Sequence, residues 1–324
     1  MDAAPYEPLA WQHLRGPDVA ALDRARTIVW VAVSPLEVHG PHLPTATDVV
    51  EARGFGRAIM QRFAERFPEV THVELPAYHV AADVLPHAGS VAFRPATVRR
   101  VVEDVAASLA RQGFRHVWLT NFHAGPRHLV AMEVAADAVS RRHGARVLSV
   151  FSLLLAHLNG GSQEIADVLG PLPGIARDDL VGDAHGGALE TSLMLHLLGE
   201  HVAADYAALP PRTVAMALAA EGRPPLPDLG GAALGALVRR FRETLAYYHR
   251  TTYAGAPGKG SAAAGEAALA RLGSVSADAL AEVWLGRVRP EDLRSPLWKA
   301  RHLLMAPLLG DLFERWATGE PPRV

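Results

Sequence analysis

Residues Thr27–Val33 have the sequence TIVWVAV. It is short, apolar and rich in β-branched residues, as is typical of a strand buried on both faces. Two similar runs follow at His116–Thr120 (HVWLT) and Arg146–Phe151 (RVLSVF). Buried strands of this kind predict a central sheet that is covered on both sides.

Helical patterns lie between these strands. Val49–Phe67, Pro95–Gln112 and His128–His143 carry apolar residues at helical spacing, and the last two stop at Gly113 and Gly144. Strand and helix therefore alternate along this part of the chain. The alternation predicts an α/β fold, a three-layer α/β/α sandwich with a mostly parallel central sheet.

The pattern weakens after about residue 199. A helix is expected over Ala232–Arg250, and a mainly helical tail is expected over Val275–Trp316, which includes the Leu/Trp-rich stretch Leu303–Trp316. Nothing in the sequence resembles a domain linker. We therefore expect one domain over residues 1–270 and a helical C-terminal extension, residues 271–324, packed on the same domain.

Composition narrows the classes of function. The chain has 324 residues, with 32 Lys+Arg against 34 Asp+Glu and a formal net charge of −2. This balance gives no electrostatic pattern for nucleic acid or an anionic membrane, so neither is an expected partner. The absence of cysteine excludes disulfide scaffolds, thiolate metal sites and cysteine nucleophiles, while 16 histidines keep metal chemistry open. We see no signal peptide or spanning segment and expect a cytoplasmic protein.

The first candidate cluster follows directly on Thr27–Val33 and contains Glu37, His39 and Asp48. Ligands of open α/β sheets bind outside the carboxyl ends of the strands, so the location suits a site. Glu37 and His39 face the same way in extended backbone, and carboxylates with imidazole suit Zn, Mn or Fe(II). The alternative is a polar loop in which Asp48 caps the next helix, supported by Glu51 three residues on.

Two further clusters carry ligand-type residues. His123 follows the strand His116–Thr120, and the alternative for it is a turn histidine bonded to backbone. Glu190 shares a helix face with apolar residues such as Leu193, where a carboxylate is costly unless it is paired or binds a metal. The helix dipole is the alternative explanation for Glu190. His185 precedes this helix and is either a general base or a helix-entry residue.

Other catalytic motifs are missing. The loop Gly255–Gly260 departs from a phosphate-binding loop because residue 253 is Tyr and Gly260 follows Lys259. No G-x-S-x-G elbow is present, so the sequence gives no support for a serine nucleophile.

Three segments together resemble the creatininase (creatinine amidohydrolase) family. Glu37–Asp48 (EVHGPHLPTATD) resembles the family signature E-Q-H-G-P-H-L-P-x-x-T-D. Gly89–Pro95 (GSVAFRP) is similar to G-T-I-S-L-R-P, and His185–Ser192 (HGGALETS) is similar to H-A-G-x-x-E-T-S. The resemblance covers residues 8 to 270 and leaves out the C-terminal extension.

The resemblance implies an α/β/α sandwich assembled into a homohexamer, and hydrolysis of a C–N bond in an amide or ring. It also implies one or two divalent metal ions, Zn, Mn or Fe. The implied metal ligands are Glu37, His39, Asp48, His123 and Glu190, with Asp48 as the bridge if two ions bind. His185 would transfer protons, and His42, Asn121 and His87 would bind the substrate.

The chain also departs from the family pattern. Asn121–Pro126 (NFHAGP) stands where the family has N-G-H-G-G-N and creatininase has N-G-H-Y-E-N. Gly125 therefore replaces a metal-binding glutamate, and Pro126 replaces an asparagine. His87–Gly89 (HAG) stands where the sequence F-P-G is usual. Creatinine itself is accordingly not the expected substrate, and a second ion would depend on Glu190.

These observations predict a divalent-metal-dependent amidohydrolase that acts on a small molecule or a peptide. Three substrate classes fit the resemblance: a linear or cyclic amide, a peptide bond in a modified peptide, and a carbohydrate-like ring of the inosose kind. A hypothesis from another class is a non-catalytic metal-binding scaffold protein, motivated by the altered Asn121–Pro126 segment and the helical tail.

Overall fold

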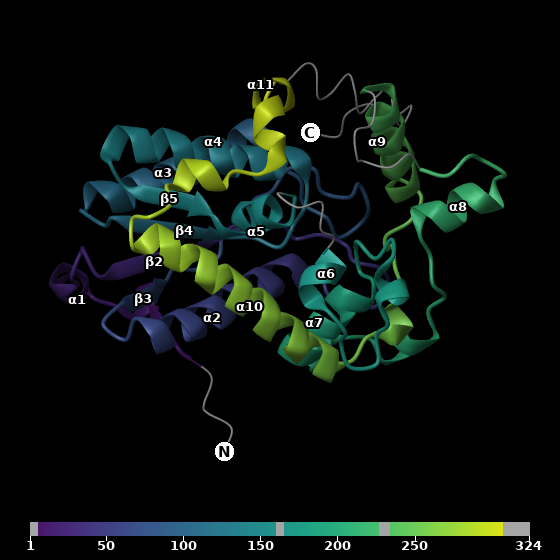
Figure 1. The fold of residues 1–324 in the computed structure, drawn as a ribbon, viewed down its shortest axis with the longest axis horizontal. Helices are drawn as coiled ribbons and strands as arrows, with labels where there is room; N and C mark the ends of the chain where they lie inside the picture. Colours follow the sequence, from purple (N-terminus) through teal and green to yellow (C-terminus); the bar gives the residue numbers. More distant parts are fainter. Residues whose placement is uncertain (1–5, 160–164, 227–233, 307–324) are drawn as a thin grey trace.

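The computed structural model describes residues 6–159, 165–226 and 234–306. Figure 1 shows a central sheet between two layers of helices. Among the described residues the sheet has the order β1-β3-β2-β4-β5, and all its strands are parallel. The strands are β1 (Leu9–Ala10), β2 (Thr27–Ala32), β3 (Thr71–Glu74), β4 (His116–Thr120) and β5 (Arg146–Ser149). The predicted fold class is confirmed.

Strand β2 divides the hydrophobic core in two. Ile28 and Trp30 enter one core cluster, while Val29 and Val31 enter the other. Alternate side chains of a strand point to opposite faces of the sheet, so an uninterrupted apolar run supplies both clusters. Thr27–Val33 therefore packs against both layers of helices and places the sheet between them.

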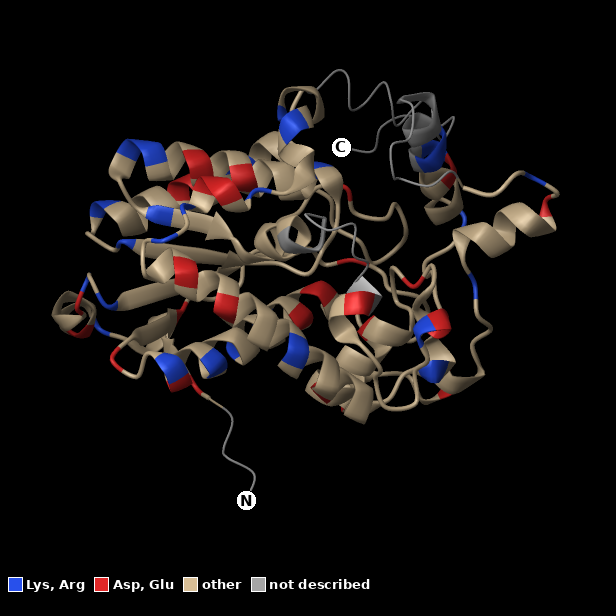
Figure 2. Ribbon diagram, in the orientation of Figure 1, with Lys and Arg blue, Asp and Glu red and all other residues tan. Residues whose placement is uncertain are grey.

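Helices cover both faces of the sheet. The α-helices are α1 (Gly16–Ala21), α2 (Thr47–Arg66), α3 (Pro95–Arg111), α4 (Pro126–His143), α5 (Val150–Asn159), α6 (Ile165–Leu169), α7 (Ala188–Leu198), α8 (Val214–Ala220), α9 (Leu234–Tyr248), α10 (Ala262–Trp284) and α11 (Arg301–Leu304). Short 3₁₀ helices lie at Trp11–His13, Arg177–Leu180, Gly199–His201, Ala204–Ala208, Pro257–Lys259, Pro290–Leu293 and Pro296–Ala300. In Figure 1, α3 and α4 lie on one side of the sheet and α2 and α10 on the other, while α8 and α9 lie at one end of the molecule. Figure 2 shows acidic and basic residues interspersed along these helices.

One predicted strand extends too far. Residues Val150 and Phe151 belong to α5 rather than to β5, which ends at Ser149. The helix follows the strand without a turn, and a continuous apolar run carries no signal for such a change. The other predicted strands and helices end within two residues of the observed bounds, apart from those in the C-terminal part of the chain.

Strand β3 was not predicted from the sequence because three of its four residues are polar. His72 accepts a hydrogen bond from Trp30 Nε1 at 2.9 Å. Glu74 pairs with Arg53 and Arg57 of α2, each at 3.0 Å. Buried polar side chains with specific partners therefore replace the apolar pattern on which the prediction depended.

The C-terminal part is helical where it is described. Helix α10 packs against α2 and α7, and its first turn is capped by Ser261 Oγ, which accepts a hydrogen bond from the backbone N–H of Ala264 at 3.2 Å. Of the expected helices, Ala232–Arg250 begins and Leu303–Trp316 ends outside the described residues. The division at residue 270 stays a prediction. No helix in the described part of the chain is long and apolar enough to cross a membrane.

The buried His72 predicts that stability falls in acid. Burial lowers the pKa of His72 to about 4, and its Nδ1 already accepts the hydrogen bond from Trp30. The unfolded chain therefore binds the proton first, and stability is lost as the pH falls from about 6.5 to about 4, by about 3 kcal/mol from this residue. We expect thermal unfolding of EDTA-treated protein to show this loss. His72→Gln retains an acceptor for Trp30 but does not titrate, so its pH dependence should be shallower; equal slopes in both proteins would contradict the assignment.

Candidate metal centre

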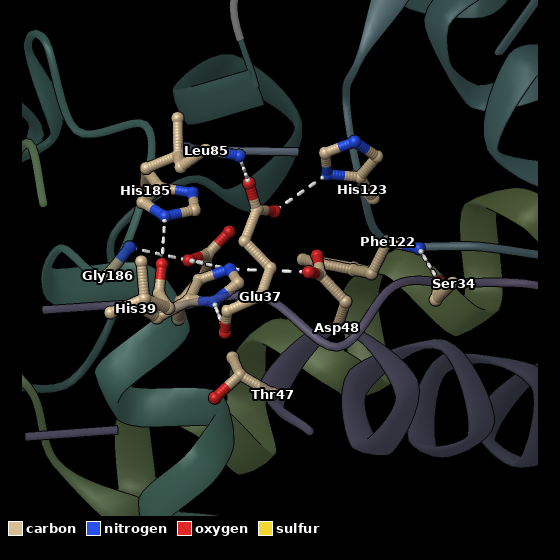
Figure 3. Close-up of polar contacts among 12 residues, drawn as sticks. Ser34, Glu37, His39, Thr47, Asp48, Leu85, Phe122, His123, His185 and Gly186 are labelled. Carbon is tan, nitrogen blue, oxygen red and sulfur yellow. Dashed lines mark hydrogen bonds and ion pairs between the residues drawn. The ribbon is translucent and has the colours of Figure 1, made fainter. Parts of the chain in front are cut away.

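The candidate ligands meet at the carboxyl edge of the sheet (Figure 3). The loop after β2 carries Glu37 and His39, and Asp48 lies in the first turn of α2. The loop after β4 carries His123, and Glu190 lies in the first turn of α7. Parallel strands present all these loops at one edge, which explains how residues far apart in sequence come together.

Glycine allows the loop after β2 to fold back on itself. Gly40 has a φ of 68°, and a Cβ there would lie 2.7 Å from Nδ1 of His42. The backbone N–H of Gly40 donates to the carbonyl of Thr252 at 2.7 Å, and that of Glu37 donates to the carbonyl of Thr45 at 2.8 Å. These bonds hold Glu37 in a fixed position before any ligand binds.

Glu37, Asp48 and His123 form the first group of ligand atoms, which lie within 4.8 Å of one another. His123 Nδ1 lies 3.0 Å from Glu37 Oε2, and His123 Nε2 donates to the carbonyl of Ala82 at 2.9 Å. Burial opposes charge on His123, but Glu37 and Asp48 outweigh it and raise the pKa of His123 to about 10. Burial likewise opposes charge on Glu37, but His123 lowers the pKa of that carboxyl far below its usual value. In the metal-free protein a proton on His123 Nδ1 thus occupies the place that a cation would take.

His39, Asp48 and Glu190 form the second group. His39 Nδ1 donates to the carbonyl of Glu37 at 3.0 Å, so the neutral ring has its lone pair on Nε2. That nitrogen faces Asp48 Oδ2 at 3.5 Å and Glu190 Oε2 at 3.6 Å. Neither His39 Nε2 nor Asp48 Oδ2 makes a hydrogen bond within the described residues. Three electron-rich atoms thus face one another in a buried space, which is the arrangement that a bound cation stabilises.

Burial keeps these groups from carrying charge without a cation. Burial lowers the pKa of His39 to about 3 and raises the pKa of Glu190 to about 8. It also raises the pKa of Asp48 well above its usual value. The site therefore favours neutral side chains when it is empty of cations and gains its negative charge when a cation binds.

His185 lies beside the second group. Its ring stacks on the ring of His39 with the centroids 3.9 Å apart. Its Nε2 donates to the carbonyl of Val38 at 2.8 Å, which leaves Nδ1 to accept a proton. The ring of Tyr248, in α9, also contacts His185 in an edge-to-face arrangement, with the centroids 5.6 Å apart.

The three residues expected to bind substrate lie around this centre. His42 is buried and bonds the hydroxyl of Thr191 at 2.9 Å, and His87 Nε2 donates to the carbonyl of Tyr248 at 2.7 Å. Asn121 is buried, and its side chain holds the loop after β4 by bonding the backbone of His123. Substrate contact stays a prediction for all three.

The space beside Gly125 explains the altered second motif. A Cβ on Gly125 would lie 2.5 Å from His123 Nε2 and 2.9 Å from both the carbonyl of Ala82 and the Cβ of Asp83. Asp83 has a φ of 60°, and its carboxylate bonds the backbone and side chain of Arg127 at the start of α4. A segment brought in from residues 82–83 therefore fills the space into which a side chain at position 125 would point.

Two residues near the centre were missed as functional candidates. Glu51 is buried one turn after Asp48, and the signal for it was a carboxylate on the α2 face that also carries Ala52 and Phe55. Asp48 does not cap α2, because the helix begins after Ala46 and shows no side-chain cap. The capping alternative for Asp48 and Glu51 is therefore wrong. Tyr248 had no sequence signal, because only the folded chain brings α9 to His185.

The residues present suit a divalent cation. Imidazole nitrogens and carboxylate oxygens are ligands of Zn, Mn and Fe, and the unpaired atoms of His39 and Asp48 lack any other partner among the described residues. The protein is therefore an α/β/α protein with a parallel sheet. The carboxyl edge of this sheet carries histidines and carboxylates of the kind that bind divalent metals.

A family model described as creatinine amidohydrolase matches residues 12–280. The chain belongs to the creatininase family, which comprises metal-dependent amidohydrolases. No curated protein matches the chain.

Solved structures of the family share the fold. A creatinine amidohydrolase (creatininase) structure has a TM-score of 0.56 and 21% identity, covering 86% of this chain and 99% of its own. A manganese creatininase gives 0.54 and 22%, with the same coverage. A protein from Bacteroides fragilis, provisionally named a creatinine amidohydrolase, gives 0.58 and 18%, covering 86% of this chain and 97% of its own. At these identities the matches establish the fold alone.

Proposed function

We propose that this protein is a divalent-metal-dependent hydrolase that cleaves the C–N bond of an amide or cyclic amide in a small molecule or peptide. The observation that carries the proposal is the meeting of three ligand-type atoms: His39 Nε2 lies 3.5 Å from Asp48 Oδ2 and 3.6 Å from Glu190 Oε2. Membership of an amidohydrolase family supports the type of reaction.

Two cation positions share one carboxylate in this proposal. Glu37, Asp48 and His123 would hold one ion, and His39, Asp48 and Glu190 would hold the other. Asp48 belongs to both groups and would bridge them. Related creatininase structures are named for manganese and for a Zn–Zn form, which supports Zn or Mn here beside Fe.

A divalent ion at this site would act as a Lewis acid that polarises a carbonyl and makes water acidic at neutral pH. The remaining work belongs to the side chains. His185 accepts a proton at Nδ1 from the attacking water and passes it to the nitrogen that leaves, so an amide and water give an acid and an amine. The hydrogen bond from His185 Nε2 to Val38 fixes the ring in the orientation and tautomer that this step needs. Proton transfer of this kind contributes about 10²–10⁴-fold to the rate.

The residues around the centre limit which substrates can reach it. His87 and Tyr248 bond each other beside His185, so α9 forms a wall of the site. The altered residue at Gly125 argues against creatinine and for a different amide. The homohexamer and the cytoplasmic location expected from the resemblance stay predictions.

The test is hydrolysis of a panel of linear amides, cyclic amides, short peptides and inosose-like rings by protein loaded with Zn²⁺ or Mn²⁺. Chelation with EDTA should abolish turnover, and the metal should restore it. Glu37→Gln and His123→Ala should lower both metal content and turnover, whereas His201→Ala, a change on the surface, should lower neither. The proposal is wrong if Glu37→Gln and His123→Ala leave metal content and hydrolysis intact. A protein that binds metal tightly and cleaves no member of the panel would favour the scaffold hypothesis.

A further inference from the structure

Glu51 is a fully buried carboxylate that the proposed mechanism does not use. It lies in α2, and its exposed fraction is 0%. Neither of its carboxylate oxygens makes a hydrogen bond within the described residues. A buried carboxyl group without a partner costs free energy, so a residue of this kind needs a reason at this position.

The position of Glu51 in α2 directs its side chain toward the metal centre. Residues three apart on a helix share a face, so Glu51 lies on the same face as Asp48. Side chains of a helix lean toward its N-terminus, and the N-terminal turn of α2 is the turn that carries Asp48. The Glu51 side chain therefore leans toward the cation site rather than away from it.

The neighbouring helix closes the other side of Glu51. Helix α2 approaches α7 so closely that a Cβ on Gly54 would lie 2.6 Å from Leu197 Cδ1. Glu190 lies at the start of α7, across from Glu51. Burial first, and then the charges of Glu190 and Asp48, raise the pKa of Glu51 well above its usual value. The charges of both carboxyl groups thus act on Glu51.

The metal centre of this chain lacks one carboxylate that the family pattern contains, and Glu51 offers a replacement for its charge. The family pattern has a carboxylate two residues after the histidine that corresponds to His123, and this chain has Gly125 there. Ala82 and Asp83 fill the space beside Gly125, and the carboxylate of Asp83 bonds Arg127. Glu51 brings a carboxylate from the opposite helix into the same centre.

We propose that Glu51 is a further cation-binding carboxylate of this centre, on the side of His39, Asp48 and Glu190, and that it supplies the negative charge that Gly125 does not. The inference rests on the metal centre proposed above and concerns its affinity rather than its reaction.

The test is metal binding by Glu51→Gln, measured by titrating the EDTA-treated protein with Zn²⁺ or Mn²⁺ in a calorimeter. We expect one equivalent to be lost or to bind about 10–100-fold more weakly, as when a supporting partner of a metal site is removed. Glu51→Asp keeps the charge on a shorter side chain and should retain more affinity than Glu51→Gln. The metal-free Glu51→Gln protein should unfold at the same temperature as wild type or higher, because it loses no partner.

Glu133→Gln is the matched control. Glu133 is also buried and has one unpartnered oxygen among the described residues, but its other oxygen accepts a hydrogen bond from the backbone of Ser295. Its replacement should leave metal affinity unchanged. Wild-type stoichiometry and affinity in Glu51→Gln would overturn this inference and leave the metal centre standing. Absence of metal binding by wild type would overturn both.

Discussion

Replacement of Asp48 by asparagine is expected to remove nearly all bound divalent metal from the protein. Asp48 belongs to both ligand groups: it joins Glu37 and His123 in one, and its Oδ2 faces His39 Nε2 at 3.5 Å in the other. Loss of this carboxylate therefore weakens both cation positions. Elemental analysis of purified wild type and Asp48→Asn should show the content falling from one or two equivalents to less than about a tenth of that, since each tenfold loss in affinity corresponds to only about 1.4 kcal/mol.

Folding of Asp48→Asn is expected to survive the change. Burial raises the pKa of Asp48 well above its usual value, so the metal-free protein gains little from this carboxylate. The metal-free variant should therefore unfold near the wild-type temperature. Asp278→Asn, which removes an exposed carboxylate from α10, is the control and should keep wild-type metal content. Full metal content in Asp48→Asn would contradict the assignment of Asp48 to both ligand groups.

Replacement of His185 by alanine is expected to lower kcat by about 10²–10⁴-fold while the metal stays bound. His185 stacks on His39 without a hydrogen bond to Glu190 or Asp48, and its fixed Nε2 leaves Nδ1 as the atom that moves the proton. The measurement is kcat on the best amide of the panel, with metal content determined on the same samples. Added imidazole should restore part of the rate, because alanine leaves the space of the ring open.

Two results would contradict this role. An unchanged kcat in His185→Ala would remove His185 from the reaction. Loss of metal together with activity would show that His185 is a metal ligand. Its distance permits this, because ligand atoms of His185, Glu37 and His39 lie within 4.8 Å of one another.

The strands of the sheet could be predicted from the sequence where their side chains are apolar on both faces. Thr27–Val33 and His116–Thr120 were located because each supplies two core clusters at once. Strand β3 was missed because His72 and Glu74 are buried through particular partners, Trp30 and the arginines of α2, which no local pattern reveals. The end of β5 was placed too late because an apolar run continues unbroken into α5.

The candidate site could be predicted as three clusters but not as one geometry. Strand ends marked Glu37, His39 and His123, and the resemblance linked them to Glu190. The tautomer of His39 and the filled space beside Gly125 depend on backbone groups of Glu37 and Ala82, which sequence patterns do not describe. The assignment of these residues to metal binding stays a prediction until a cation is located.

Anomalous X-ray diffraction from crystals loaded with Mn²⁺ or Zn²⁺ is the most direct test of the metal centre. We expect one or two peaks at about 2.0–2.3 Å from ligand atoms of the Glu37–Asp48–His123 and His39–Asp48–Glu190 groups. Peaks confined to other parts of the molecule, or no peak between these side chains at a saturating metal concentration, would contradict it.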